Sequence, residues 1–336
     1  MKKVILSTMI ISSSLLSFGQ SAIKYPATKK IDKVDVYFGN SIPDPFRWLE
    51  DDRSAETAEW VKEQNKVTFD YLAAIPFRNT IKARMEKLWN YEKVSAPFKE
   101  GDYTYYYKNN GLQNQSVMYR KDAKGTEELF LDPNTFSKDA TTSLDGVSFS
   151  KDGSLVAYSI SEAGSDWRKV IFIDAKTKQS IGEPLVDVKF SGLSWKGNEG
   201  IFYSSYEKPK GSELSAKTDQ HRLFFHKLGT KQAEDAILFG DQEKRRYVGG
   251  YVSDDNRYLF ISAANSTSGN ELYLKDLSVP NSPIVAIHKG FEYDVDVLDN
   301  IGTTLFIVTN LKAPNKRIVT VDVANPGVEN WKDLIP

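Results

Sequence analysis

The chain has 336 residues, and its 44 lysines and arginines nearly balance 45 aspartates and glutamates, so the formal net charge is −1. This balance provides no basic field for nucleic acid and no acidic tail. The sequence contains no cysteine, which excludes disulfide bonds and zinc–thiolate sites as supports of the fold. Aromatic residues make up 12% of the chain, and together with many Val, Ile and Thr they favour β structure.

The first 20 residues have the layout of a secretory signal peptide. A basic start precedes an apolar run from Val4 to Phe18, and a small residue, Gly19, follows it. This run is shorter than the about 20 residues that span a bilayer, and no other segment is long and apolar enough to do so. We expect residues 1–20 to be cleaved and the protein to be periplasmic or secreted, without a membrane partner; an uncleaved anchor is the alternative.

Residues 21–92 are predicted to form a helical segment. Ser54 is a suitable N-cap, and Pro76 should end the helix that begins after it. Asn79 or Thr80 could cap a second helix. The apolar residues that recur at helical spacing are Trp60, Val61, Val67, Tyr71 and Leu72 in the first helix and Ile81, Met85, Leu88 and Trp89 in the second.

Residues 93–336 repeat a pattern of paired β-rich runs. Each unit opens with an apolar run, a turn containing Gly, Asp or Asn, and a second β-rich run, which is typical of a hairpin. Five such hairpins occupy residues 95–107, 146–158, 192–203, 249–260 and 296–306. Matching positions are Phe98, Phe149, Trp195, Val252 and Leu298, which are 46 to 57 residues apart. A second strand pair follows each hairpin.

A period near 50 residues with four strands per unit is typical of a β-propeller blade. We therefore predict a mainly β fold with about five four-stranded blades. A β-sandwich is the competing interpretation, but it would not repeat its turn chemistry at this interval. Five blades could close a ring alone or belong to a larger ring, because propellers close with about 4 to 8 blades.

The sequence shows no complete catalytic site. It has no Gly-x-Ser-x-Gly turn, which would present a nucleophilic serine. Of the three histidines, His221 and His226 are five residues apart on one predicted strand and so face opposite sides. We expect these two and His288 to make hydrogen bonds at blade surfaces or between blades. Neither metal-ligand spacing nor a phosphate-binding glycine loop is present, so we expect no metal and no cofactor.

Several segments resemble the prolyl oligopeptidase family. The resemblance covers nearly all of the chain after the signal peptide, and the first segment is closer to prolyl oligopeptidase itself than to the branch that cleaves after basic residues. The segments are Ile42-Pro-Asp-Pro-Phe-Arg-Trp-Leu-Glu-Asp-Asp, Gly164-Ser-Asp-Trp, Val188-Lys-Phe-Ser-Gly-Leu-Ser-Trp, Gln220-His-Arg-Leu-Phe-Phe-His-Lys-Leu-Gly and Gly290-Phe-Glu-Tyr.

The resemblance implies a secreted serine endopeptidase that hydrolyses Pro-Xaa bonds in oligopeptides. In that family a seven-bladed propeller restricts access to an α/β-hydrolase domain that holds the Ser-Asp-His triad. It implies that residues 21–92 pack on such a domain, absent here, and that 93–336 are about five of the seven blades. Phe190 matches the propeller aromatic of the substrate pocket. We expect this chain alone to be inactive; the alternative is a free-standing propeller that binds without catalysis.

Overall fold

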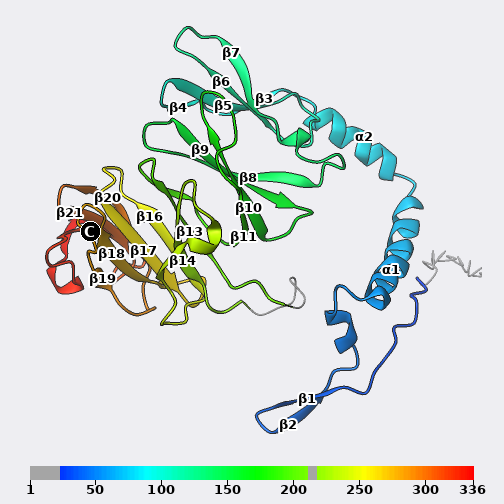
Figure 1. The fold of residues 1–336 in the computed structure, drawn as a ribbon. Coiled ribbons are helices and arrows are strands. Elements are labelled where there is room, and N and C mark those ends of the chain that lie inside the picture. Colours follow the sequence, from blue (N-terminus) through cyan, green and yellow to red (C-terminus); the bar gives the residue numbers. More distant parts are fainter. Residues whose placement is uncertain (1–22, 211–217) are drawn as a thin grey trace, which may run out of the picture. The chain divides into compact units, whose positions relative to one another are not determined.

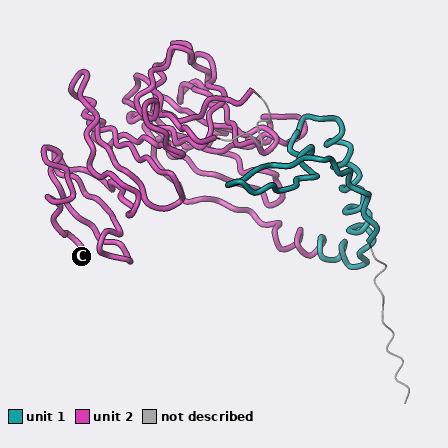
Figure 2. The backbone as a smooth tube through the Cα atoms, turned by 90° about the horizontal axis from the view of Figure 1, so that it is seen from below, with its two compact units in different colours: residues 1–83 teal, residues 84–336 magenta. Residues whose placement is uncertain are grey.

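The computed structural model describes residues 23–210 and 218–336, so the predicted signal peptide lies outside the described residues. The chain divides into two compact units, residues 1–83 and 84–336 (Figure 2). Among the described residues, no helix combines the length and the apolar character needed to cross a membrane.

The first unit opens with a two-stranded hairpin of β1 (Val34–Tyr37) and β2 (Asn40–Pro43) (Figure 1). Its two-residue turn has positive φ at both positions, 50° at Phe38 and 82° at Gly39, as tight hairpins require. A short 3-10 helix, η1 (Arg47–Glu50), follows. Within the segment that resembles the family motif, the Arg47 guanidinium pairs with Asp35 and with Asp44, the latter at 2.7 Å.

Two helices follow, and the first begins where the sequence predicts. The Ser54 hydroxyl accepts a hydrogen bond of 3.0 Å from the Thr57 amide, so Ser54 caps α1 (Ala55–Ala73). The helix ends before Pro76, as expected. The predicted start of α2 is wrong, because α2 (Arg78–Trp89) begins before Asn79. The Arg78 amide already donates to the Ile75 carbonyl at 3.2 Å, so a helical turn forms without a cap at 79 or 80.

The second unit consists of five antiparallel sheets, each made of consecutive strands. The first blade has β3 (Lys93–Val94) and β4 (Phe98–Glu100), both paired with β5 (Tyr103–Asn109), then β6 (Val117–Lys121) and β7 (Glu127–Leu131). The second has β8 (Thr142–Phe149), β9 (Leu155–Glu162), β10 (Trp167–Asp174) and β11 (Leu185–Lys189). The third has β12 (Ser194–Lys196), β13 (Gly200–Ser205), β14 (Arg222–Lys227) and β15 (Ala236–Phe239).

The last two blades complete the set. The fourth has β16 (Tyr247–Val252), β17 (Tyr258–Ala264), β18 (Glu271–Asp276) and β19 (Ile284–His288). The fifth has β20 (Val295–Ile301), β21 (Thr304–Thr309), β22 (Arg317–Asp322) and β23 (Lys332–Ile335). Short 3-10 helices are η2 (Pro133–Thr135), η3 (Gln232–Glu234) and η4 (Val328–Asn330).

The predicted repeat corresponds to one blade. The five matching positions all lie in the first strands of their sheets, on β4, β8, β12, β16 and β20. This confirms the four-stranded repeat. It also rules out a sandwich, because a sandwich would mix strands from distant parts of the chain in each sheet. The hairpin turns require glycine in places: Gly153 has φ of 71°, and a Cβ there would meet the Gly101 backbone at 2.3 Å.

The hydrophobic core lies between neighbouring blades. One cluster joins Tyr105 and Met118 of the first blade to Val156 and Ile173 of the second. Similar clusters join each later pair of blades, and Trp195, which is only 5% exposed, belongs to the one between the second and third. Each blade therefore buries its apolar faces against its neighbours, as expected for stacked sheets.

Candidate functional site

The site lies at one end of the second, third and fourth blades. Neighbouring strands in each blade are antiparallel, so the starts of the first and third strands lie beside the ends of the second and fourth strands. We call this end the first face. Hydrogen bonds between blades confirm that these ends adjoin one another, because residues just before third strands bond to the first strands of the next blades.

Three aromatic rings from three blades meet on the first face. Phe190 directly follows β11, Tyr206 directly follows β13, and Tyr247 begins β16. The Phe190 ring centroid lies 6.2 Å from that of Tyr206, in an edge-on arrangement, and 6.3 Å from that of Tyr247. We call these three residues the aromatic cluster. Such geometry is favourable for aromatic pairs, and of the three rings Phe190 is the most exposed, whereas Tyr206 is buried.

Phe190 is not a strand core residue. Its side chain is 50% exposed, and its φ is 53°, in the left-handed region. A residue with a side chain is disfavoured there by roughly 1–2 kcal/mol. Residues held in sparsely populated backbone conformations often lie at active sites and ligand-binding sites. This placement supports the predicted role of Phe190, which stays a prediction.

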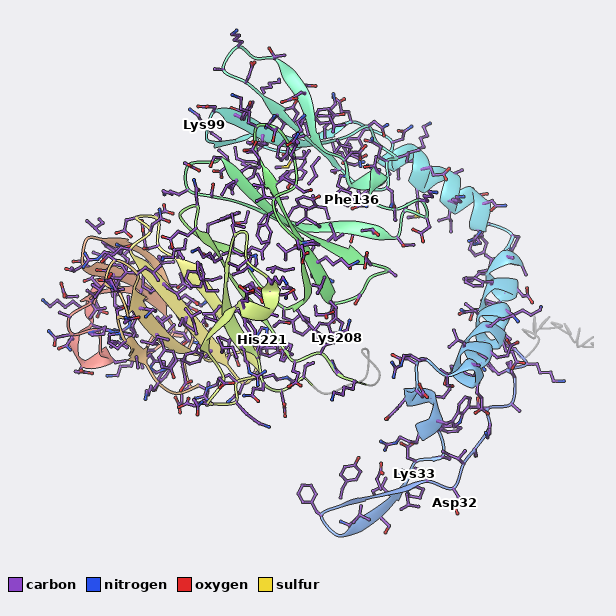
Figure 3. The ribbon with its side chains drawn as sticks, viewed as in Figure 1. Asp32, Lys33, Lys99, Phe136, Lys208 and His221 are labelled. Atoms are coloured by element: carbon purple, nitrogen blue, oxygen red, sulfur yellow. The ribbon has the colours of Figure 1, made fainter. Side chains whose placement is uncertain are left out.

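Two cations lie over rings of the aromatic cluster, and a third pairs with an aspartate of β11. The ammonium group of Lys189, a buried residue, lies 5.1 Å from the centroid of the Phe190 ring and 4.9 Å from that of Trp167. The Arg246 guanidinium lies 5.7 Å from the Tyr247 ring. Lys208, labelled in Figure 3, forms an ion pair of 2.7 Å with Asp187. Cations over ring faces are attracted by the ring quadrupole, so these contacts help to hold the rings in place.

A buried histidine lies beneath the aromatic cluster. His221, just before β14 and labelled in Figure 3, is fully buried. Its Nδ1 accepts a hydrogen bond of 2.9 Å from the Val248 amide, and its Nε2 lies 2.9 Å from the Lys189 carbonyl oxygen. The imidazole also stacks on the Tyr206 ring at 4.3 Å. Burial lowers the pKa of His221 to about 4, so the ring is neutral at neutral pH.

The other two histidines lie elsewhere. At the far end of β14, His226 Nδ1 is 2.8 Å from Asp235 Oδ1, and Asp235 also accepts a hydrogen bond of 2.8 Å from the Tyr203 hydroxyl. His288 ends β19, and burial lowers its pKa. His221 therefore makes the predicted bonds between blades, whereas His226 bonds within its own blade. Within residues 23–210 and 218–336, no imidazole is bonded to a serine hydroxyl, and no acidic or histidine cluster could hold a metal ion.

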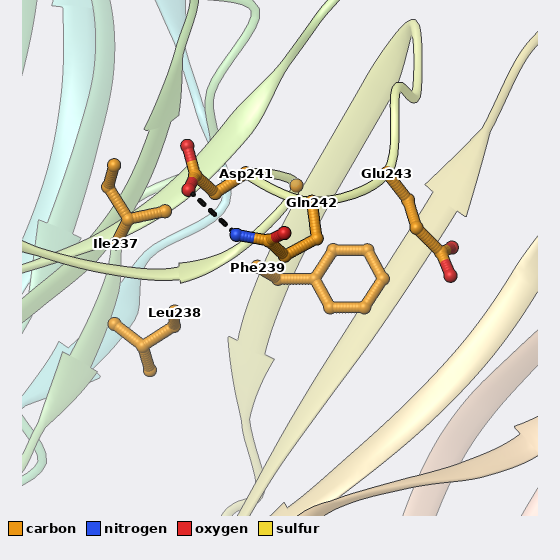
Figure 4. Close-up of a pocket in the computed structure, with 7 residues that line it drawn as sticks. Ile237, Leu238, Phe239, Asp241, Gln242 and Glu243 are labelled. Carbon is orange, nitrogen blue, oxygen red and sulfur yellow. Dashed lines mark hydrogen bonds between the residues drawn. The ribbon is translucent and has the colours of Figure 1, made fainter.

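A hollow lies elsewhere, at β15, the outermost strand of the third blade, and the loop that follows it. One continuous stretch, residues 237–243, lines it (Figure 4). Its polar groups are already engaged, since Gln242 bonds to Asp241 at 3.3 Å and Asp241 pairs with Arg222. The aromatic cluster is the stronger candidate, because it brings side chains from three blades to one place.

Sequence reasoning singled out Phe190 but missed its neighbours. Tyr206 and Tyr247 lie in no motif that the sequence analysis quotes, and Lys189 lies in the Val188–Trp195 segment without being singled out there. All three lie at strand ends, and which strand ends meet depends on how the blades are arranged. His221 was predicted to make hydrogen bonds at a blade surface or between blades, but not to lie beside Phe190. The one local signal that could have drawn attention to Tyr247 is the run of three cations, Lys244 to Arg246, just before it.

Five consecutive antiparallel sheets, four with four strands and the first with five, have cores between them and define a β-propeller. Residues 26–336 match the family model described as the N-terminal β-propeller domain of prolyl oligopeptidase, and the chain belongs to this family. It is 58% identical to the prolyl endopeptidase of Elizabethkingia miricola and 57% identical to that of Elizabethkingia meningoseptica, over 317 residues in each case. Each match covers 94% of this chain and 45% of the relative, so the chain spans about half the length of these relatives.

Solved structures support the same fold. Prolyl oligopeptidase B from Galerina marginata, bound to a 35mer hydrolysis and macrocyclization substrate, matches with a TM-score of 0.80 at 26% identity. That match covers 94% of this chain and 47% of the other. A structure from a study of two prolyl endopeptidases is 33% identical, with a TM-score of 0.66, and covers 93% of this chain and 45% of that one.

Proposed function

We propose that this chain is the N-terminal part of a serine endopeptidase that hydrolyses Pro-Xaa bonds in oligopeptides. Hydrolysis would be carried out by an α/β-hydrolase domain outside these 336 residues, and the propeller would restrict which peptides reach it. The observation that carries the proposal is the 58% identity to a prolyl endopeptidase across 94% of this chain. The described residues also lack a serine–histidine pair, in keeping with catalysis elsewhere.

The aromatic cluster would contact the peptide in this scheme. Phe190 would present its exposed ring to an apolar part of the substrate, with Tyr206 and Tyr247 supporting it. Lys189 and Arg246 lie over the rings, and their positive charge would be compatible with a peptide carboxylate nearby. We also propose, from the predicted signal peptide, that the protein acts in the periplasm or after secretion.

The test compares this chain with a longer one. The 336-residue chain should not cleave a chromogenic peptide with proline before the scissile bond, whereas a chain extended with the remaining blades and the hydrolase domain of a prolyl endopeptidase should cleave it. Turnover by the 336-residue chain alone would contradict the proposal. Replacing the nucleophilic serine of the added domain should abolish cleavage, which controls for contaminating peptidases.

Size-exclusion chromatography addresses the alternative of a free-standing binding propeller. A closed five-bladed ring predicts a monomer that unfolds in one cooperative step. Part of a larger ring exposes the open faces of its first and last blades, and unpaired sheet surface favours association. A monomer that unfolds cooperatively and binds peptides, but gains no activity when the hydrolase domain is added, would favour the binding module.

A further inference from the structure

His221 contacts the Tyr206 ring and the backbone of the residues next to Phe190 and Tyr247. Its Nε2 bonds to the carbonyl of Lys189, the residue before Phe190. Its ring stacks on Tyr206. Its Nδ1 bonds to the amide of Val248, the residue after Tyr247. One buried side chain therefore touches the second, third and fourth blades at the places from which the three rings project.

We propose that His221 is a positioning residue for the aromatic cluster: it holds Phe190 in its exposed orientation and keeps the other two rings against it. The value of this positioning for peptide binding rests on the function proposed above. The geometric claim, that Phe190 changes its orientation without His221, stands apart from that function and is tested separately.

The hydrogen bonds determine which tautomer His221 adopts. A backbone N–H can only donate, so the Val248 amide requires an unprotonated Nδ1. The proton of the neutral ring must then be on Nε2, which donates to the Lys189 carbonyl. Both bonds are made by one neutral tautomer, and the opposite tautomer would lose both. The side chain is therefore matched to a single orientation between the blades.

The bond to Lys189 acts directly on Phe190. The Lys189 carbonyl belongs to the peptide group whose rotation about the next N–Cα bond is the φ of Phe190. That φ is 53°, a conformation that phenylalanine does not favour by itself. A donor fixed in the neighbouring blade holds this carbonyl in place. Without the donor, the peptide is free to relax to a negative φ, which would redirect the exposed ring.

Two other blades have polar side chains at the equivalent position, and they serve as a comparison. Asn270, just before β18, bonds through both amide atoms to the backbone of Val295 in the fifth blade. Gln115, just before β6, bonds to Thr142 and Leu144 in the second blade. Both join one blade to the next. His221 alone among these three also bonds backward, to the preceding blade, and it does so beside Phe190.

The experiment uses the 336-residue chain with ¹³C-labelled phenylalanine and tyrosine rings. In His221→Phe the ring is retained but both hydrogen bonds are lost, so we expect the Phe190 resonance, assigned with Phe190→Ala, to shift or broaden. Affinity for the peptide acetyl-Phe-Gly-Pro-amide should fall about tenfold, because binding would then have to return Phe190 to its strained φ. The control, Asn270→Ala, should lower stability and leave the Phe190 resonance in place.

An unchanged Phe190 resonance in a folded His221→Phe variant would overturn the proposal, as would an equal shift in Asn270→Ala. If His221→Phe does not fold, two measurements replace it. His221→Gln can keep both bonds and should preserve the Phe190 resonance, and ¹⁵N spectra of the unaltered chain should show Nε2 protonated and Nδ1 not. The opposite tautomer, or a Phe190 shift in the glutamine variant, would refute the bonding scheme.

The binding data separate the two proposals. If Phe190→Ala leaves peptide affinity unchanged, the proposed role of the aromatic cluster fails, while the ring resonances still decide whether His221 positions Phe190. A different result is that Phe190→Ala weakens peptide binding, whereas His221→Phe shifts the Phe190 resonance and leaves peptide affinity unchanged. His221 would then position the ring without affecting peptide recognition, which contradicts the functional part of the inference.

Discussion

Large apolar side chains are mostly exposed in the helical segment and buried in the propeller core. In the propeller, Trp195 is 5% exposed and packs between two blades. In α2, Trp89 is 64% exposed, and Ile81, Met85 and Leu88 on the same helix are exposed as well. A sheet face is covered by the next blade in the chain, whereas a single helix stripe needs a partner. The exposed stripe of α2 therefore lacks such a cover in the described residues, and we propose that the hydrolase domain would provide one.

The largest expected effect is the loss of stability when a buried side chain of the propeller is truncated. Phe172 is buried between the second and third blades, with its ring 6.1 Å from Trp195. Phe172→Ala should lower the free energy of unfolding by about 3–5 kcal/mol, because it leaves a cavity in a packed core. In α1, Phe69 is 63% exposed, so Phe69→Ala should change it by less than about 0.5 kcal/mol. Urea unfolding measures the free energy of unfolding of both variants. Similar losses in the two would contradict the difference between the propeller and the helical segment.

The next effect depends on pH. Burial lowers the pKa of His221 from 6.5 to about 4, so between these values the unfolded chain binds a proton that the native chain does not. The stability from the neutral ring is complete above pH 6.5 and is lost as the pH falls through 4, by about 3 kcal/mol.

Urea unfolding between pH 4 and 7 would measure this loss. His288, whose pKa is also lowered by burial, acts in the same direction. Carboxylates such as Asp152, whose pKa is lowered by hydrogen bonds from Ser154 and Asn198, add a loss at lower pH in every variant. His221→Gln should therefore flatten only part of the profile. An identical slope in the variant would show that His221 does not titrate as described.

A third prediction compares buried and exposed arginines. Arg120 is almost fully buried and donates to the carbonyls of Ala175 and Lys176 in the next blade. Arg120→Met should lower the free energy of unfolding by about 2–3 kcal/mol, because it leaves these carbonyls without donors. Arg47, in the first unit, pairs with carboxylates near the surface, so Arg47→Met should lower the free energy of unfolding much less than Arg120→Met does. Thermal unfolding would distinguish them, and equal losses would be against the prediction.

The smallest effect is local to α1. Ser54→Ala removes the side-chain acceptor of the Thr57 amide and should weaken the start of the helix by about 1 kcal/mol. Hydrogen exchange at the first amides of α1 should accelerate accordingly, while propeller amides should not change. Thr68→Ala, in the middle of the same helix, is the control and should not accelerate exchange, since alanine favours helix. Faster exchange throughout the chain in Ser54→Ala would contradict a local effect.

Local chemistry explains which parts of the fold could be predicted from the sequence. The blade repeat rests on hairpin turns, such as the one at Gly153, and on alternating strands, which are encoded within a few residues. The cap at Ser54 is similarly local. The start of α2 was predicted too late because the first turn of that helix bonds to the preceding chain at Ile75, and no side-chain cap marks it.

The sequence by itself determined the four-stranded repeat, the first helix and the family. Turn residues, strand patterns and family motifs each depend on a few neighbouring residues, so they can be recognised without the tertiary structure. Only the tertiary structure decided that Phe190, Tyr206 and Tyr247 meet, and that His221 lies between them. These residues come from different blades, and their meeting depends on how the blades stack. Stacking buries a histidine that is unremarkable on its own strand and makes it neutral, bonded on both sides and close to the proposed site.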